Sequence, residues 1–238
     1  MWIKRQSYSR RLKAGEKKRR RTARLNGKYI MVNHIKKSNQ VVVIGASAGG
    51  IYALTEVVSH LPYNLQAAVI LIQHLTRDHK TQLHEYLARR CLLPVRLAED
   101  KLPIEAGVVY VSIPGHHLCL KDGYLLLKRG KPVNYVWPSL DVLFTSAAQE
   151  YGSRVIGVIL TGTGRDGTRG AQKIKERGGV TIAQDEKSSY FFGMPRAAIE
   201  AGAIDYILPL DEIAEKIVDL ARRDIRKRKR KAKEKIKR

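Results

Sequence analysis

The segment 45–50, with the sequence GASAGG, holds the residues of this chain best suited to chemistry. It satisfies the pattern G-x-S-x-G, with Ser47 between an apolar run and a helix-like segment. Small neighbours let the backbone turn sharply, and the N–H groups that open the next helix attract negative charge. Ser47 is therefore placed to attack a carbonyl whose oxyanion is stabilised by nearby N–H groups. The alternative is a phosphate-binding turn in which Ser47 only caps the helix.

A nucleophilic serine needs a base, because a free hydroxyl is a weak nucleophile near neutral pH. His74 directly follows the second apolar run, residues 67–73. In a doubly wound sheet the carboxyl ends of neighbouring parallel strands lie together and bind ligands, and an imidazole suits proton transfer. We therefore expect His74 to serve Ser47 as the base. The alternative is a structural histidine that ends a strand.

The third member of a triad orients the imidazole and stabilises its charged form. Asp166 lies in the glycine-rich segment 161–167, which follows the apolar run 155–160, so the same edge of the sheet should hold it. The alternative is an aspartate that caps the next helix. The order Ser, His, Asp differs from the Ser, Asp, His order of α/β-hydrolases, so the pattern does not indicate that family.

Residues 162–167 also match G-x-G-x-x-G, and Asp185 ends the following strand, which is nearly a complete dinucleotide fingerprint. A dinucleotide-binding oxidoreductase is thus one alternative. However, Asp166 would bring negative charge close to the pyrophosphate, and the turn around Ser47 would have no role. A non-catalytic binding module on an esterase-like scaffold is the second alternative. We prefer a hydrolase to both.

The elements that must position these residues alternate between apolar runs and segments with helical periodicity. This pattern predicts an α/β fold, a doubly wound, mainly parallel sheet of the Rossmann-like three-layer type. Strands are expected at 41–46, 67–73, 95–98, 108–111, 155–160, 180–183 and 204–207, and helices at 51–60, 81–90, 138–148, 195–201 and from 211 onward. Asp122 and Gly123, between 117–121 and 124–128, predict a β-hairpin addition.

Taken together, these segments resemble the catalytic domain of the bacterial chemotaxis protein-glutamate methylesterases. The resemblance covers about residues 41 to 208 and rests on segments that occur in the family's order. They are 44–50, 73–74, 114–117, 138–144, 158–167, 182–184 and 192–195. The resemblance implies that Ser47 is the nucleophile, His74 the general base and acid, and Asp166 the residue that orients His74.

Family members hydrolyse γ-glutamyl methyl esters on the cytoplasmic helices of chemoreceptors, release methanol, and in some cases deamidate receptor glutamines. The resemblance implies the same activity and partners for this chain, in chemotaxis adaptation, with no metal and no organic cofactor. Oxyanion and substrate contacts are expected from the turns near Ser47 and Thr163. The candidates are Ala48, Gly49, Thr163, Gly164 and Met194.

The sequence differs from the family pattern at three points, and these differences bear on activity and regulation. Ala48 stands where Thr is common, which removes a hydroxyl beside the nucleophile, and Trp137 stands where Arg is frequent. The usual member also carries an N-terminal phosphorylatable receiver domain, whereas 40 residues precede Val41. We therefore expect the catalytic domain without the receiver domain, and an esterase that is ungated or gated by a separate protein.

The positive charge is concentrated at the two ends of the chain. Of 45 basic and 22 acidic residues, 14 and 1 lie in residues 1–38 and 12 and 2 in residues 221–238, which leaves 19 of each between them. We expect a basic, disordered N-terminal arm at 1–40, a catalytic domain at 41–220 and a basic C-terminal tail at 221–238. Translation from Met31 is an alternative that would shorten the arm.

The tails are expected to dock electrostatically to anionic membrane or to the receptor, with solvated arms that have no partner as the alternative. Nucleic acid is an unlikely partner, because the tails hold few aromatic residues for base stacking: Trp2, Tyr8 and Tyr29. Cys91 and Cys119 form no disulfide framework or paired metal motif, and no apolar run approaches the roughly 20 residues of a membrane span. A cytoplasmic location is therefore expected.

Overall fold

The computed structural model describes residues 21–25, 28–32, 38–74, 82–133 and 135–236. The chain divides into two units, residues 1–35 and 36–238. The larger unit holds every candidate site residue. None of the described helices is both long enough and apolar enough to cross a membrane.

A seven-stranded sheet with only parallel pairings forms the centre of the larger unit. Its strand order is β11-β10-β9-β3-β4-β6-β5. The strands are β3 (Val41–Ala46), β4 (Ala68–Gln73), β5 (Val95–Leu97), β6 (Val109–Val111), β9 (Val155–Ile159), β10 (Val180–Gln184) and β11 (Tyr206–Leu208). Within this sheet the chain enters at the central β3, builds one half with β4, β5 and β6, and then adds β9, β10 and β11 on the other side of β3. This order confirms the doubly wound sheet.

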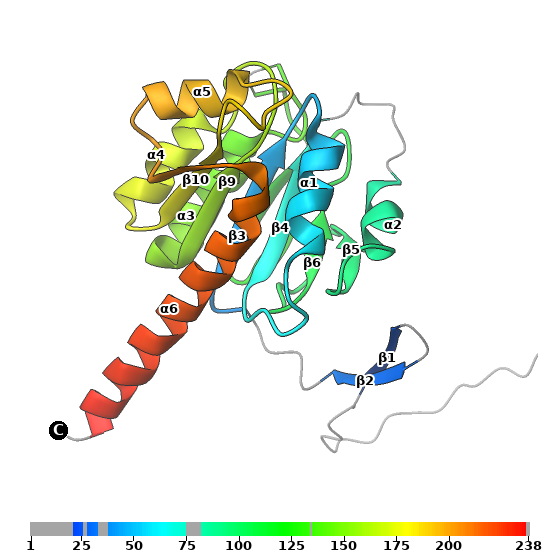
Figure 1. The fold of residues 1–238 in the computed structure, drawn as a ribbon, viewed down its shortest axis with the longest axis vertical. Helices are drawn as coiled ribbons and strands as arrows, with labels where there is room; N and C mark the ends of the chain where they lie inside the picture. The colour runs from blue at the N-terminus through cyan, green and yellow to red at the C-terminus, as the bar shows by residue number, and fades with distance from the viewer. Residues whose placement is uncertain (1–20, 26–27, 33–37, 75–81, 134, 237–238) are drawn as a thin grey trace, which may run out of the picture. The chain divides into compact units, whose positions relative to one another are not determined.

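Helices cover both faces of the sheet (Figure 1). Helices α1 (Gly50–Ser59), α2 (Leu83–Ala88) and α6 (Leu210–Ile236) pack on one face. Helices α3 (Leu140–Tyr151), α4 (Thr168–Glu176) and α5 (Gly193–Glu200) pack on the other, and a short 3-10 turn, Gly152–Arg154, follows α3. The three-layer architecture is therefore confirmed.

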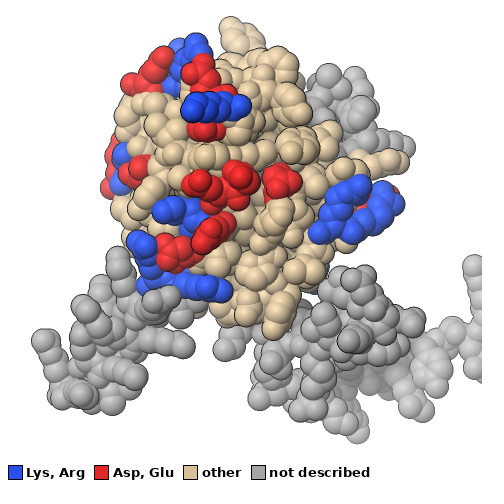
Figure 2. All heavy atoms as spheres, viewed as in Figure 1, with Lys and Arg blue, Asp and Glu red and all other residues tan. Residues whose placement is uncertain are grey.

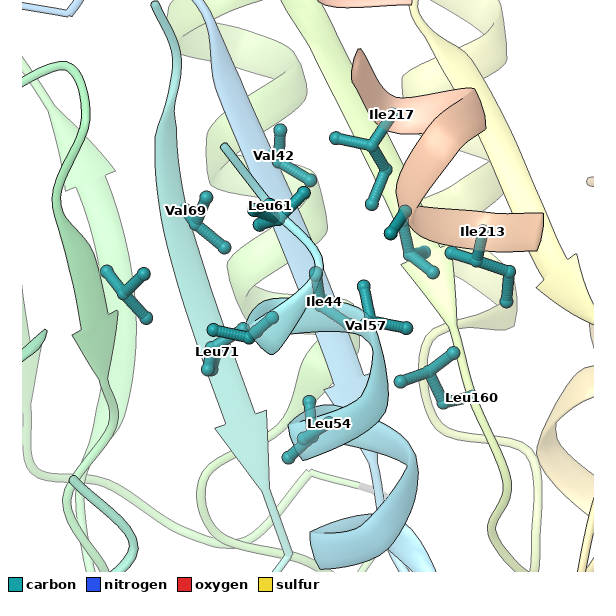
Figure 3. Packing of buried hydrophobic residues seen from close by; sticks show 14 of the residues in the cluster. Val42, Ile44, Leu54, Val57, Leu61, Val69, Leu71, Leu160, Ile213 and Ile217 are labelled. Carbon is teal, nitrogen blue, oxygen red and sulfur yellow. The ribbon is translucent and has the colours of Figure 1, made fainter. Parts of the chain in front are cut away.

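Successive side chains along each strand point to opposite faces of the sheet, and this creates two apolar cores. In β3, Val42 and Ile44 belong to the core beneath α1 and α6, while Val41 and Val43 belong to the core beneath α3 to α5. Figure 3 shows Ile44 and Leu71 from the sheet among side chains of α1, with Ile213 and Ile217 of α6 nearby. Because both faces are buried, the strands are continuous apolar runs, which made them recognisable in the sequence.

The hairpin predicted around Asp122 is present as β7 (His117–Lys121) and β8 (Tyr124–Lys128), which pair antiparallel as a separate sheet. It lies against α3, where the Leu120 N–H donates to Ser146 Oγ at 3.0 Å. The hairpin therefore helps to hold the helix whose first residues reach the candidate site.

The structure describes two paired strands within the N-terminal arm. Residues Arg21–Leu25 (β1) and Lys28–Val32 (β2) pair antiparallel, whereas residues 1–20 lie outside the described part of the chain. The sequence between the two strands is Asn26-Gly27, a dipeptide that favours tight hairpin turns.

Helix α2 differs from the expected bounds, and helix α6 agrees with them. Helix α2 is shorter than the expected 81–90 segment, and Thr81 lies outside the described residues. Helix α6 continues to Ile236, as the helix-forming composition of the basic tail suggested.

Candidate active site

The three candidate residues follow three neighbouring strands. Ser47 comes directly after β3, His74 directly after β4, and Asp166 lies in the turn between β9 and α4. Because β9, β3 and β4 are adjacent in the sheet and parallel, their carboxyl ends share one edge. The position predicted from the alternating pattern is therefore the position observed.

Hydrogen bonds from both neighbouring strands fix the Ser47 turn. The Ser47 N–H donates to the Thr161 carbonyl at 3.0 Å, and Gln73 Nε2 donates to the Ser47 carbonyl at 2.8 Å. The Thr161 hydroxyl also donates to the Ala48 carbonyl at 3.0 Å. Gly49 has a φ of 74°, a backbone angle that residues other than glycine rarely adopt, and α1 begins at the next residue. The half-buried Ser47 thus sits on a rigid turn at a helix N-terminus.

His74 and Asp166 form a direct pair, with 2.9 Å between Nε2 and Oδ2. Their side chains are 9% and 3% exposed. Because an ionised carboxylate only accepts hydrogen bonds, Nε2 carries the proton that faces Asp166. In the neutral imidazole, Nδ1 then carries the lone pair that can take a proton.

The Asp166 carboxylate also caps α3, a helix far away in the sequence. Ser139 Oγ donates to Oδ1 at 2.8 Å, and the Leu140 and Asp141 N–H groups donate to the two carboxylate oxygens. Burial alone would raise the pKa of Asp166, but the His74 hydrogen bond, the Leu140 N–H, the charge on His74 and the Ser139 hydroxyl together lower that pKa below its usual value. Asp166 is therefore a buried group that stays ionised.

Packing explains the spacing of the glycines in 162–167. A Cβ added to Gly162 would lie 2.4 Å from Met194 Sδ and 2.8 Å from Ser47 Cβ. One added to Gly167 would lie 2.6 Å from Leu140 Cδ2. These two glycines are required for close approach within the protein, so the pattern needs no dinucleotide to account for it.

Asp185, the acidic residue of the dinucleotide alternative, is engaged within its own turn. Its Oδ1 accepts hydrogen bonds from the N–H and the hydroxyl of Ser188. The geometry therefore gives the oxidoreductase alternative no support. Among the described residues, no group of three or more His, Cys, Asp or Glu could hold a metal ion.

The five oxyanion and substrate candidates divide into two groups. Ala48 is half-buried, and Gly49, Thr163 and Gly164 are exposed near the Ser47 turn. Met194 is fully buried, and its N–H already donates to the Gly162 carbonyl at 2.8 Å. Met194 therefore packs beneath the turn, and its contact with the oxyanion or substrate stays a prediction.

Exposed apolar side chains border the Ser47 turn. Tyr52 and Tyr190 are 57% and 68% exposed, and their rings meet edge to face with centroids 5.9 Å apart. Ile51 and Phe191 beside them are each 48% exposed. A Cβ added to Gly49 would lie 2.9 Å from Tyr190 Cβ, so this aromatic rim adjoins the Ser47 turn directly.

Sequence reasoning missed the residues that hold the site together. Gln73 and Thr161 clamp the Ser47 turn, and Ser139 binds Asp166. Only Ser139 had a usable signal, its position at the start of a helix, where a hydroxyl usually bonds the helix backbone. Its hydroxyl instead reaches a residue 27 positions away, which no local pattern shows.

The fold and the site define a class of protein: a doubly wound α/β protein in which one edge of the sheet holds a serine and a histidine–aspartate pair, the components of a serine hydrolase site. Residues 42–217 match the family model described as CheB methylesterase. The chain belongs to this family.

Individual relatives agree with the family model. The chain is 46% identical over 183 residues to protein-glutamate methylesterase/protein-glutamine glutaminase 2 of Anaeromyxobacter dehalogenans, covering 77% of this chain and 54% of that protein. It is 38% identical over 190 residues to a putative protein of the same description from Leptospira interrogans, covering 79% and 98%. The Thermotoga maritima CheB methylesterase catalytic domain superposes with a TM-score of 0.74 at 38% identity, covering 76% of this chain and 98% of that one.

The first two relatives are longer than the region they share with this chain. The chain spans 54% and 58% of their lengths. What the whole relatives do is therefore taken up as a proposal for this chain.

Proposed function

We propose that this protein is a serine hydrolase that removes methyl esters from glutamate side chains of chemoreceptors and releases methanol. The observation that carries the proposal is the 2.9 Å contact between His74 Nε2 and the buried Asp166 carboxylate, at the edge of the sheet where Ser47 lies between β3 and α1. The family, and the names of relatives such as that from Anaeromyxobacter, supply the substrate class.

In the first step, Ser47 Oγ attacks the ester carbonyl. His74 Nδ1, the ring nitrogen that Asp166 does not engage, takes the hydroxyl proton. Asp166 holds the ring and stabilises its positive charge. The tetrahedral intermediate then collapses, the carbon–oxygen bond to the methoxy group breaks, and His74 returns the proton so that methanol leaves.

In the second step, water hydrolyses the acyl-serine. His74 Nδ1 accepts a proton from the water, whose oxygen attacks the acyl carbonyl, and the proton then returns to Ser47 Oγ. The glutamate side chain is released as a carboxylate. A glutamine side chain would follow the same course with ammonia as the leaving group, in keeping with the second part of the relatives' names.

N–H groups of the Ser47 turn and of the Thr163 turn are the proposed oxyanion donors. Ala48 and Gly49 stand at the N-terminus of α1, where backbone N–H groups and the helix dipole favour negative charge. Thr163 and Gly164 are exposed beside Gly162, which packs against Ser47. The substrate carbonyl would lie between the two turns.

We further propose that the partners are methylated cytoplasmic helices of chemoreceptors and that the protein acts in the cytoplasm. The aromatic rim around Tyr52 and Tyr190 supports a protein substrate, because a chain segment that presents an ester to Ser47 must cover these exposed rings. Burial of aromatic surface would contribute to its binding.

The basic ends are proposed to bring the enzyme to its substrate. The body is electrically neutral over residues 39–220, and the face seen in Figure 2 carries both Lys or Arg and Asp or Glu side chains. The positive excess lies in the two tails, where each Lys or Arg contributes about 1 kcal/mol of attraction to an anionic surface. We therefore assign docking to anionic membrane or acidic receptor surface to the tails rather than to the body.

Methanol release from methylated receptor cytoplasmic fragments tests the function. The purified wild-type protein should release methanol with multiple turnovers, and Ser47→Ala should lower the rate by at least about a thousandfold. Ser59→Ala, which removes a half-buried hydroxyl at the far end of α1, is the matched control and should leave the rate unchanged. A folded wild-type protein without turnover on any methylated receptor fragment contradicts the proposal.

A further inference from the structure

His117, a buried residue of β7, forms hydrogen bonds with both nitrogens of its ring. The Ser139 N–H lies 3.2 Å from Nδ1, and the Lys131 carbonyl oxygen lies 2.9 Å from Nε2. A backbone N–H can only donate, so Nδ1 must be unprotonated. A carbonyl can only accept, so Nε2 must carry the proton. The two partners thus select one neutral tautomer of His117.

Ser139 connects this ring to the active site. Its N–H is held by His117, and its hydroxyl donates to Asp166 Oδ1 at 2.8 Å. Ser139 also precedes α3, whose first two N–H groups bind the same carboxylate. Three successive donors to Asp166 therefore depend on the placement of one backbone segment, which His117 fixes from the opposite side.

The geometry points to His117 as a positioning residue for the reaction. Its Nδ1 lone pair holds the Ser139 amide, Ser139 and the start of α3 hold Asp166, and Asp166 holds the ring of His74. His117 touches neither substrate nor nucleophile and acts only through this chain of contacts. The inference rests on the proposed function, because it assigns His117 a part in the same proton transfer.

The position of His117 on the β7–β8 hairpin explains why it can restrain the start of α3. The side chain is 5% exposed and comes from the β7–β8 hairpin, which is outside the parallel sheet that carries the three site residues. The sheet fixes where Ser47 and His74 lie, but it does not fix the start of α3. The hairpin provides that restraint through His117, and a hydrogen bond from the Leu120 N–H to Ser146 Oγ ties the same helix about two turns further along.

Two substitutions separate the two ring nitrogens. In His117→Asn the amide oxygen stands near the Nδ1 position and can still accept from Ser139, whereas in His117→Gln the amide nitrogen reaches toward Lys131 and the Nδ1 acceptor is lost. We expect His117→Gln to lower kcat on methylated receptor fragments about ten- to a hundredfold at unchanged KM, since a small displacement of a catalytic group has effects of that size. His117→Asn should keep kcat within about threefold of wild type.

Leu118→Ala is the control for a merely structural effect. Leu118 is buried in the same strand and packs in the core beside α3, so its truncation should lower the midpoint of thermal unfolding. The kcat per folded molecule should not change. Equal losses of kcat in the Asn and Gln variants, or no loss in either, would overturn the proposal.

A second measurement does not depend on activity. In the wild-type protein with 15N-labelled histidine, NMR should show His117 protonated at Nε2 and not at Nδ1. The opposite tautomer would overturn the inference even in an active enzyme. If wild type shows the expected tautomer but releases no methanol, the proposed function fails while the contact that positions Asp166 stands.

Discussion

The Asp166 carboxylate shows how this site keeps a negative charge inside the protein. It accepts from His74, from the Ser139 hydroxyl and from two N–H groups at the start of α3. A buried carboxylate is costly without partners, and these donors, with the positive end of the helix dipole, offset that cost. The same contacts leave His74 one orientation.

Asp166→Asn should make the protein less stable as well as less active. At neutral pH we expect a loss of about 1–3 kcal/mol in the free energy of unfolding, because a buried ionised acceptor of several hydrogen bonds is replaced by an amide that also presents donors. Activity should fall more steeply, by about four orders of magnitude if the amide fixes the wrong tautomer of His74. Urea unfolding and methanol release measure the two effects.

The stability effect should depend on pH. The pKa of Asp166 in the folded protein lies below its usual 3.8, so the ionised carboxylate stabilises the fold fully above that value, and this stability is lost as the pH falls through the folded pKa. The difference in unfolding free energy between wild type and Asp166→Asn should therefore be smaller near pH 3 than near pH 7. An equal difference at both pH values would show that Asp166 is not the ionised group described here.

The turn after β9 and the turn after β3 pack closely against each other. Gly162 allows this, since an added Cβ would overlap Met194 Sδ and Ser47 Cβ. We expect Gly162→Ala to cost about 1–3 kcal/mol through overpacking and to lower kcat, because Ser47 must move. Unfolding and kinetics on the same preparation provide the measurement.

Gly202→Ala is the matched control for that substitution. Gly202 has a φ of 66°, and an added Cβ would meet nothing within 4 Å, so the cost is backbone strain of about 1–2 kcal/mol. The control should lose stability and keep kcat. If both variants keep kcat, the close contact between Gly162 and Ser47 is not needed for activity.

The aromatic rim gives a prediction about binding rather than chemistry. Tyr190→Ala removes an exposed ring that stands beside Gly49 and meets Tyr52. We expect KM for a methylated receptor fragment to rise by about tenfold or more, in line with the loss of an interface aromatic, while turnover of a small glutamyl methyl ester stays unchanged. Tyr63→Ala, an equally exposed tyrosine beyond the far end of α1, should change neither. A proportional loss on both substrates would place Tyr190 in the chemistry instead.

The strands of the sheet could be predicted from the sequence, but the contacts between the site and the start of α3 could not. Strands such as β3 and β4 are buried on both faces and therefore appear as unbroken apolar runs, which located Ser47 and His74 at their ends. The contact between Ser139 and Asp166 joins segments 27 residues apart and depends on how α3 crosses the sheet. No periodicity encodes that crossing, so the site was predicted as three residues rather than as a supported network.

At the scale of the whole molecule, charge and chemistry occupy different parts of the chain. The site lies within residues 39–220, where basic and acidic residues balance, and the positive excess lies in the flanking segments. Helix α6 runs from the neutral part of the chain into the basic C-terminal tail. Its first turns bury Leu210, Ile213 and Ile217 against the sheet, and its later residues are mostly Lys and Arg.

Removal of residues 224–238 should separate docking from catalysis. The truncation keeps every described buried position of α6 and removes ten basic and two acidic residues. We expect an unchanged thermal midpoint, an unchanged kcat on a small ester, and weaker sedimentation with vesicles that contain anionic lipid or with receptor fragments. Binding of the full chain should fall as salt rises. Salt-independent binding, or equal binding by the truncated chain, would contradict electrostatic docking by this tail.

Identification of the nucleophile tests the proposed mechanism most directly. A fluorophosphonate that reacts with activated serines should label the wild-type protein on the peptide that contains Ser47, label Ser47→Ala not at all, and label Asp166→Asn much more slowly. Mass spectrometry of the digested protein gives the position. Labelling of a different residue, or equal labelling of the Asp166 variant, would contradict a Ser47 nucleophile activated through His74 and Asp166.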